Sequence, residues 1–265
     1  MHICLPFILQ FDLESSSPTA GPVFTFEADT FFTLHHINAF ETADRRVIFD
    51  CLSYANADEF FGPNAFGFLE VMHDPARLAH TAPSDLRRYT LDLTAPPGKQ
   101  YATFVSIAVR DATGHPRALE VPSSNPVVAR SPYCFVYGLN IDAPADATRW
   151  SLVKASVCGV ASGADSSPLS AGELMGKVPR DAGAASLVWY REHHMPTEPV
   201  FVPRPGAVAE DDGVVLATVL DGDANESYLI VLDAATMLPI AEVRLADRRG
   251  HVVPFSIHGQ WRSAA

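Results

Sequence analysis

The sequence predicts an all-β fold. Short runs of β-branched and aromatic residues recur along the chain, separated by turn residues, at the spacing typical of a β-sandwich, barrel or propeller. Most of the 21 prolines and 16 glycines fall between these runs, where turns belong. With 48% apolar and 19% charged residues, the composition is that of a globular protein that can bury a core.

The apolar runs are expected to form the strands, in the order in which they occur. They read "PVFTFEA", "RRVIFDCLSY", "RRYTLDL", "YATFVSIAVRD", "CFVYGLNI", "RWSLVKASV", "SLVWYRE", "GVVLATVLDG" and "SYLIVLDAATMLPIAEVRL". Two hairpins are predicted, one through the polar residues 42–45 and one through residues 233–239. A helical turn is expected within residues 68–80 and a long loop over residues 161–185. No linker divides the chain into separate domains.

Charge and apolar content exclude several classes of protein. The formal net charge of -12, without a Lys/Arg cluster, excludes a nucleic-acid surface, because such surfaces are basic. No apolar run approaches the length that crosses a bilayer, so no transmembrane segment is expected. The N-terminus lacks the basic region of a signal peptide, which predicts a protein that is not secreted.

The four cysteines are far apart in the sequence and show no CxxC spacing. They are Cys4, Cys51, Cys134 and Cys158. This pattern favours free buried thiols over a disulfide framework, and therefore a reducing compartment, cytoplasmic or plastid-like.

Common catalytic and metal-binding motifs are missing. HExxH, HxH, GxSxG and glycine-rich phosphate loops do not occur, so typical zinc sites, serine hydrolases and nucleotide enzymes are not indicated. What is left is histidine in apolar, strand-like surroundings.

Two adjacent histidines lie in "FFTLHHINAFE". Because neighbours in a strand point to opposite faces, His35 and His36 cannot both face one site. Alternation places His35 on one face and His36 with Asn38 on the other, and it does not show which face is buried. On composition alone, an ordinary hydrogen-bonded core histidine is the favoured interpretation, with a metal ligand as the alternative.

Three more residues stand in unusual surroundings. His258 is a lone histidine in "VVPFSIHGQW", and Glu120 in "ALEVP" and Glu198 in "PTEPVFVP" are acids among apolar residues and prolines. Histidine ligands commonly donate their second N–H to a carboxylate, so two histidines and two glutamates would fit a metal site. An exposed loop acid is the competing interpretation for each glutamate.

Together, these segments resemble the carotenoid cleavage oxygenase family, which includes the retinoid isomerase of retinal pigment epithelium and the lignostilbene dioxygenases. The resemblance rests on "LHHINAFE", "LEVP", "TEPVFVPRPGAVAEDDGVVLATVLDG", "SYLIVLDAATMLPIAEVRL" and "PFSIHGQW". It covers nearly the whole chain from about Phe24 onward, and residues 198–222 are its most specific part.

The resemblance implies a seven-bladed β-propeller that holds Fe(II) on its axis through four histidines, three of them supported by glutamates. His35 and His258 match the third and fourth ligands, and Glu120 and Glu198 match two of the supporting glutamates. His36 then becomes an ordinary packing residue. Asp211 and Asp212 in "EDDG" are interpreted as turn residues.

The first two ligands of the family lie well upstream of the third, whereas 34 residues precede His35 here. Residues 1–265 are therefore expected to be the C-terminal portion of such a propeller, about the last three or four blades, without those two ligands. His2 is an alternative second ligand, although its separation from His35 is shorter than the family's.

The function implied by the resemblance is that of a non-haem Fe(II) dioxygenase. It adds O2 across a double bond of a carotenoid, apocarotenoid, related polyene or stilbene and yields two carbonyl products. The lipophilic substrate implies transient contact with a membrane surface. Two alternatives stand beside this function: an inactive propeller fragment acting as a binding or scaffold protein, and a local zinc or 2-His-1-carboxylate site at His193 or His194 in "REHHMPTE".

Overall fold

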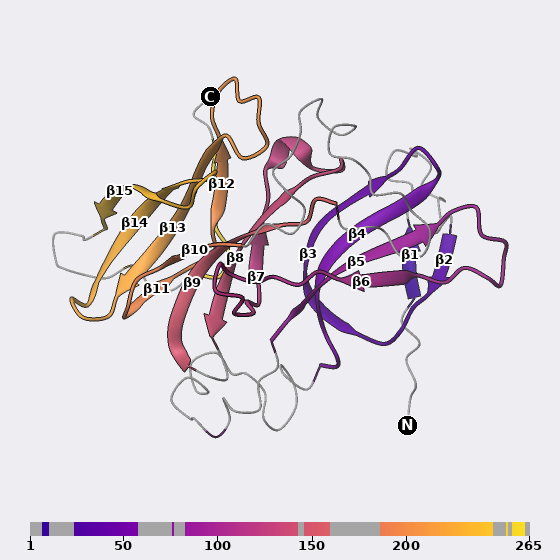
Figure 1. The fold of residues 1–265 in the computed structure, drawn as a ribbon, viewed down its shortest axis with the longest axis horizontal. Helices are drawn as coiled ribbons and strands as arrows, with labels where there is room; N and C mark the ends of the chain where they lie inside the picture. Colours follow the sequence, from indigo (N-terminus) through magenta and orange to yellow (C-terminus); the bar gives the residue numbers. More distant parts are fainter. Residues whose placement is uncertain are drawn as a thin grey trace.

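A computed structural model describes residues 7–10, 24–57, 76, 83–142, 146–159, 186–245, 253 and 256–262, with side chains described from residue 24 onward except at 146–148. Its described elements are strands and one short 3-10 helix, η2 (Pro126–Val128), and every pairing between named strands is antiparallel (Figure 1). The all-β prediction is confirmed. The described residues contain no helix long and apolar enough to cross a membrane.

Three antiparallel sheets follow one another along the chain. The first sheet holds β3 (Phe32–Glu41), β4 (Arg46–Tyr54), β5 (Asp85–Asp92) and β6 (Thr103–Ser106). The second sheet holds β7 (Glu120–Ser123), β8 (Phe135–Asp142), β9 (Asp146–Ser156) and β10 (Leu187–Tyr190). The third sheet holds β11 (His194–Pro196), β12 (Val200–Pro203), β13 (Gly213–Asp221), β14 (Glu226–Asp233) and β15 (Pro239–Arg244), and β1 (Phe7–Gln10) pairs with β2 (Phe24–Glu27) outside these sheets.

The order of strands is that of successive propeller blades. In each sheet four strands lie in sequence order from one edge to the other: β3 to β6, β7 to β10, and β12 to β15. Figure 1 shows the third sheet at the left, the second in the middle and the first at the right. The described residues thus form a partial propeller of three sheets that do not close into a ring, as predicted.

Both predicted hairpins are present. Residues 42–45 connect β3 to β4, where Arg45 adopts a positive φ of 66° and donates its backbone N–H to the Thr42 carbonyl. Residues 234–238 connect β14 to β15, and the Asp233 carboxylate accepts hydrogen bonds from the Thr236 backbone N–H and hydroxyl. The helical turn and the long loop predicted at residues 68–80 and 161–185 lie outside the described residues, apart from Ala76.

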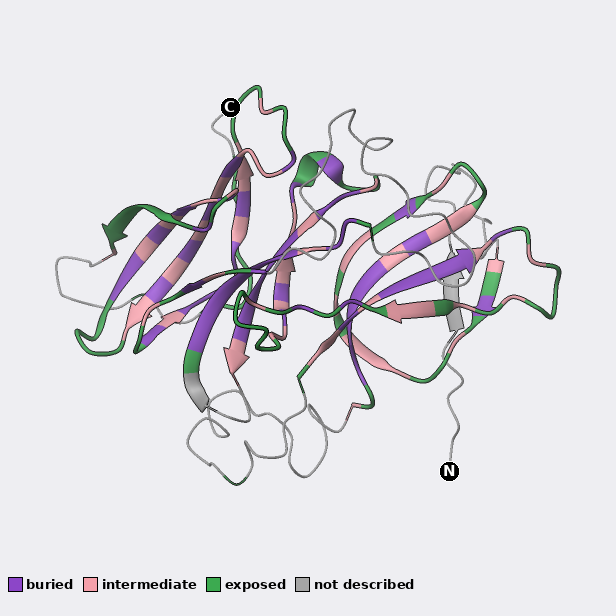
Figure 2. Cartoon of the chain, in the orientation of Figure 1, coloured by how far each residue is buried: buried purple, intermediate pink, exposed green. Residues whose placement is uncertain are grey.

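Two apolar cores hold the sheets together. One lies between the first and second sheets and includes Leu52, Leu86 and Val136; the other lies between the second and third sheets and includes Trp150, Leu152 and Ile230. In Figure 2 the buried positions follow the central strands of each sheet. The face of each sheet that meets its neighbour is therefore the apolar one.

Buried ion pairs also link neighbouring sheets. Asp50 on β4 is fully buried and accepts hydrogen bonds from the Arg88 guanidinium on β5. Nη1 of Arg88 also donates to the carbonyl of Val157, the residue that follows β9 of the second sheet. Lys154 on β9 binds Asp211 at 2.7 Å, whereas Asp212 pairs with Arg204 within the turn between β12 and β13. Asp212 thus behaves as a turn residue, while Asp211 also fastens that turn to the second sheet.

The cysteine prediction was wrong for one pair. Cys134 and Cys158 form a disulfide with their Cα atoms 4.5 Å apart, while Cys51 is free and buried, and Cys4 lies outside the described residues. The two cysteines flank β8 and β9, and the register that pairs Phe135 with Ser156 brings them together. Strand register, which linear spacing does not reveal, decides this pairing.

Candidate metal centre

His35 lies on the face of β3 that meets the second sheet. It pairs with Leu52, a residue of the core between the two sheets. Its Nδ1 is 2.8 Å from Oε2 of Glu120, and the side chains of His35 and Glu120 are 18% and 27% exposed. The hydrogen bond therefore spans the two sheets in a half-buried environment.

Two irregularities in β3 change the predicted faces. The register shifts between Thr33 and His35 and again between His36 and Asn38, so Asn38 pairs with Asp50 on the same face as His35. Asn38 also donates to the carbonyls of Val128 and Ser131, which lie in the connection between β7 and β8. The prediction that His36 and Asn38 share a face was wrong, because a bulge resets the alternation.

His36 points away from the second sheet. It pairs with Cys51, is exposed, and its ring lies 6.3 Å from that of Phe49. His36 therefore lies on the face opposite His35, as alternation predicts, and its role as a packing residue stays a prediction.

Glu120 is the first residue of β7, the strand that faces β3. Its backbone is irregular, because Val121 has a φ of 43° and the register shifts between Glu120 and Ser123. A β-branched residue rarely adopts positive φ, and such strain concentrates at functional sites. Oε1 of Glu120 accepts a hydrogen bond from the Tyr54 hydroxyl, so both carboxylate oxygens are engaged.

Gly138 on β8 lets β7 approach closely at this point. A Cβ added there would lie 2.7 Å from Cδ2 of Leu119 and 3.2 Å from the Glu120 carbonyl oxygen. The glycine within "CFVYGLNI" therefore lets β7 pack against β8 without displacing Leu119 and Glu120.

The second predicted pair lies beside the third sheet. Nδ1 of His258 is 3.2 Å from Oε1 of Glu198, and the Gly259 backbone N–H donates to Oε2 at 2.6 Å. Glu198, just before β12, is 13% exposed, whereas His258 is 64% exposed. Neither glutamate is the free loop acid of the competing interpretation.

The two histidines meet although they come from opposite ends of the described chain. Their ring centroids are 5.5 Å apart, with the ring planes at 72°. Because each Nδ1 bonds to a glutamate, each Nε2 is the nitrogen available to a metal. A carboxylate on the second ring nitrogen is the usual support for a histidine ligand. The donor set thus fits two ligands of a metal centre. The described residues hold no group of three or more His, Cys, Asp or Glu that could bind a metal, and His2 lies outside them.

The histidine doublet near β11 forms separate interactions. His193 bonds to Asp223 at 2.9 Å, and His194 is buried with its Nδ1 3.1 Å from the Tyr228 hydroxyl. Burial lowers the pKa of His194. Within the described residues this doublet does not gather the third ligand that the local metal-site alternative requires.

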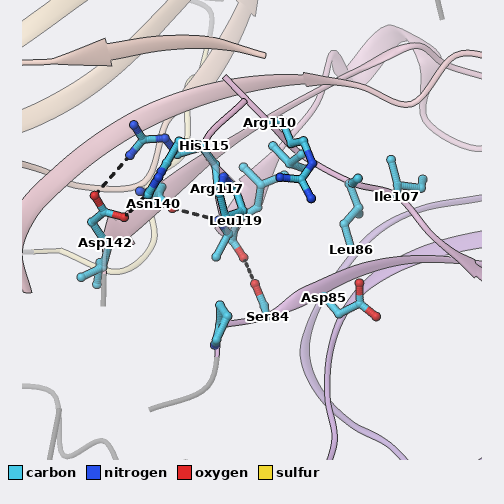
Figure 3. Close-up of a pocket in the computed structure, with 16 residues that line it drawn as sticks. Ser84, Asp85, Leu86, Ile107, Arg110, His115, Arg117, Leu119, Asn140 and Asp142 are labelled. Carbon is cyan, nitrogen blue, oxygen red and sulfur yellow. Dashed lines mark hydrogen bonds and ion pairs between the residues drawn. The ribbon is translucent and has the colours of Figure 1, made fainter. Parts of the chain in front are cut away.

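A cavity of about 370 Å³ lies between the first and second sheets (Figure 3). None of the four predicted site residues lines it. Its wall includes Leu119, the neighbour of Glu120. The Leu119 carbonyl accepts a hydrogen bond from the Ser84 hydroxyl. Arg117 and Asp142 pair at its edge. The cavity lies beside Ala118 and Leu119, which lead into β7, and it is lined by His115 but by neither His35 nor His258.

Sequence reasoning missed Tyr54, Val121 and Gly138 around Glu120. Gly138, a glycine inside a strand-like run, was a usable signal of close backbone approach. Tyr54 gave none, because its contact with Glu120 depends on how two sheets pack.

Comparison with known proteins finds one matching family and several related oxygenases. The sequence profile of the family described as retinal pigment epithelial membrane protein matches residues 13–263. The torulene dioxygenase of Fusarium fujikuroi is 30% identical over 236 residues, covering 82% of this chain and 36% of the relative. The apocarotenoid-15,15'-oxygenase of Synechocystis is 29% identical over 237 residues, covering 87% of this chain and 38% of the relative.

Solved structures show the same fold. A cobalt-substituted Synechocystis ACO superposes with a TM-score of 0.65 at 24% identity, covering 93% of this chain and 42% of that one. The lignostilbene dioxygenase of Pseudomonas brassicacearum gives 0.61 at 22% identity, covering 91% and 44%. The chain thus spans little more than a third of the length of the curated relatives.

Proposed function

The chain belongs to the retinal pigment epithelial membrane protein family of carotenoid oxygenases, and from that membership we propose that it forms part of a non-haem Fe(II) dioxygenase. The proposed reaction cleaves one double bond of a carotenoid, apocarotenoid or related polyene or stilbene. One O2 is consumed, and each of the two carbonyl products receives one of its oxygen atoms. The observation that carries the proposal is the convergence of two histidine–glutamate pairs with their rings 5.5 Å apart.

His35 and His258 would hold the iron through Nε2. Each Nδ1 keeps its proton and donates it to Glu120 or Glu198, so each imidazole is a neutral ligand in a fixed tautomer. Fe(II), when bound, supplies open coordination positions at which O2 can be activated. Neither glutamate is required as a general acid or base, because both are occupied in orienting imidazoles.

The remaining ligands would come from beyond the described residues or from another polypeptide. This requirement favours a second candidate function, a catalytically inactive propeller fragment that binds other molecules. Metal binding discriminates between the two, since the inactive fragment has no need to keep two histidines with free Nε2 atoms side by side.

A lipophilic substrate is most concentrated at membranes, and we propose transient contact with a membrane surface. Exposed apolar side chains on β15 and in residues 256–262 could make it; these are Ile240, Val243, Ile257 and Trp261. The reducing compartment stays a prediction. It was inferred from four free cysteines, and two of them, Cys134 and Cys158, form a disulfide.

The test is cleavage by the anaerobically iron-loaded chain. An apocarotenal in detergent micelles is supplied with ¹⁸O2, and products are identified by mass spectrometry. We expect two carbonyl products, each with one ¹⁸O, and none from His35→Ala, with His36→Ala as the matched control. Stoichiometric iron without cleavage would contradict dioxygenase activity of this chain by itself, and a folded chain without iron would favour the inactive fragment.

A further inference from the structure

We propose that Tyr54 is a positioning residue for the metal centre: its hydroxyl fixes the Glu120 carboxylate so that the other oxygen receives the His35 Nδ1 proton. This deepens the proposed function and rests on it for the role of the metal. The contact itself, Tyr54 to Glu120 to His35, is a property of the folded chain.

Tyr54 is rigidly placed. It is the last residue of β4, is 7% exposed, and pairs with Phe32 at the start of β3. The rings of Tyr54 and Phe32 are 6.5 Å apart and tilted by 48°. A packed ring with one polar atom can hold that atom at a defined point at little entropic cost.

Glu120 needs such a restraint. A glutamate side chain has several rotatable bonds, and this one is 27% exposed, so water competes for its oxygens. One oxygen accepts from His35 and the other from Tyr54, which leaves a single orientation that satisfies both donors.

The other pair shows the same arrangement with a different donor. Glu198 also divides its oxygens between an imidazole and a second group, but there the second donor is the Gly259 backbone N–H. Tyr54 therefore takes the place that a main-chain group fills at Glu198. Because this donor belongs to a side chain, a substitution can remove it, whereas the Gly259 N–H cannot be removed in that way.

The experiment compares Tyr54→Phe with Tyr137→Phe. Both substitutions remove one buried hydroxyl; that of Tyr137 donates to the Ala234 carbonyl at 3.0 Å, away from either histidine–glutamate pair. Histidine side chains are labelled with ¹⁵N, the protein is kept metal-free at pH 8, and His35 is assigned with a His35→Gln variant. Long-range ¹H–¹⁵N spectra report which ring nitrogen carries the proton.

We expect the Nδ1–H tautomer of His35 in the natural protein and in Tyr137→Phe. In Tyr54→Phe we expect a mixture of tautomers and exchange of the Nδ1 proton with water that is roughly tenfold faster. Unchanged tautomer and exchange in Tyr54→Phe, at a loss of thermal stability equal to that of Tyr137→Phe, would overturn the proposal.

Two further measurements test the proposal independently of the tautomer. In the natural protein a slowly exchanging Tyr54 hydroxyl proton should show a nuclear Overhauser effect to the His35 Nδ1 proton; its absence would overturn the proposal even if Tyr54→Phe fails to fold. With Co(II) as the probe, Tyr54→Phe should bind about tenfold more weakly. If the His35 tautomer shifts in Tyr54→Phe but the natural protein binds no Co(II), then Tyr54 still positions Glu120. In that case only the proposed metal-dependent function is contradicted.

Discussion

The two histidine–glutamate pairs make the same hydrogen bond in different surroundings. His35 and Glu120 meet between two packed sheets, on strands with bulges and a strained residue beside them. His258 is 64% exposed and bonds to Glu198 from residues 256–262, which belong to none of the named strands. The geometry of the first pair thus depends on sheet packing, whereas that of the second depends on one carboxylate that binds both His258 and Gly259. Substitutions should separate these dependences.

The largest effect is expected from Asp50→Asn. It leaves the buried Arg88 guanidinium without its carboxylate at the junction of the first and second sheets, and we expect the free energy of unfolding to fall by about 3–5 kcal/mol. Urea denaturation measures this. Asp212→Asn, at the exposed pair with Arg204, should change stability by less than about 1 kcal/mol. Equal losses in the free energy of unfolding in the two variants would show that the buried pair at the sheet junction stabilises the fold no more than the exposed pair does.

Glycine substitutions compare the two pairs directly. Gly138→Ala forces a methyl group against Leu119 and the Glu120 carbonyl, and we expect a loss of about 1–3 kcal/mol together with displacement of the His35 signal in NMR spectra. Gly259→Ala meets only Cγ2 of Val200, at an ordinary contact distance of 3.5 Å, so its cost should be under about 1 kcal/mol. A larger loss of stability in Gly259→Ala than in Gly138→Ala would contradict the proposed difference between the two pairs.

Glu198→Ala tests the local dependence of the second pair. It removes the acceptor of the Gly259 N–H, so we expect amide exchange at Gly259 to rise by roughly tenfold or more. Hydrogen-exchange NMR provides the measurement. Glu120→Ala should leave exchange at Gly259 unchanged, and a similar rise there would mean that the two pairs are not independent.

The smallest effect concerns a histidine that bonds to tyrosine instead of glutamate. Burial lowers the pKa of His194, with weaker opposition from Asp221, so the unfolded chain binds a proton that the folded chain does not. Stability from this residue is complete above the ordinary pKa of 6.5 and is lost as the pH falls toward the lowered value. His194→Gln should flatten the stability profile just below pH 6.5 in thermal unfolding; an unaltered slope would refute this.

The sequence predicted the parts of this fold that local pattern controls. Alternating apolar runs and polar turns indicated the strands and both hairpins, and "LEVP" and "SIHG" indicated Glu120 and His258 through the family resemblance. The sequence did not predict the contacts that depend on strand register and sheet packing. The bulge that turns Asn38 toward the second sheet, the pairing of Cys134 with Cys158 and the contact of Tyr54 with Glu120 all require knowing which residues lie opposite one another.

The central claim is that His35 and His258 are ligands of one metal. The most direct measurement is a Co(II) titration of the ¹⁵N-histidine-labelled chain, following every imidazole by NMR. We predict that the signals of His35 and His258 respond together with one midpoint, while His193, which is paired with Asp223 on the surface, does not respond at that midpoint. Different midpoints for His35 and His258, or a response of only one of them, would contradict a shared metal.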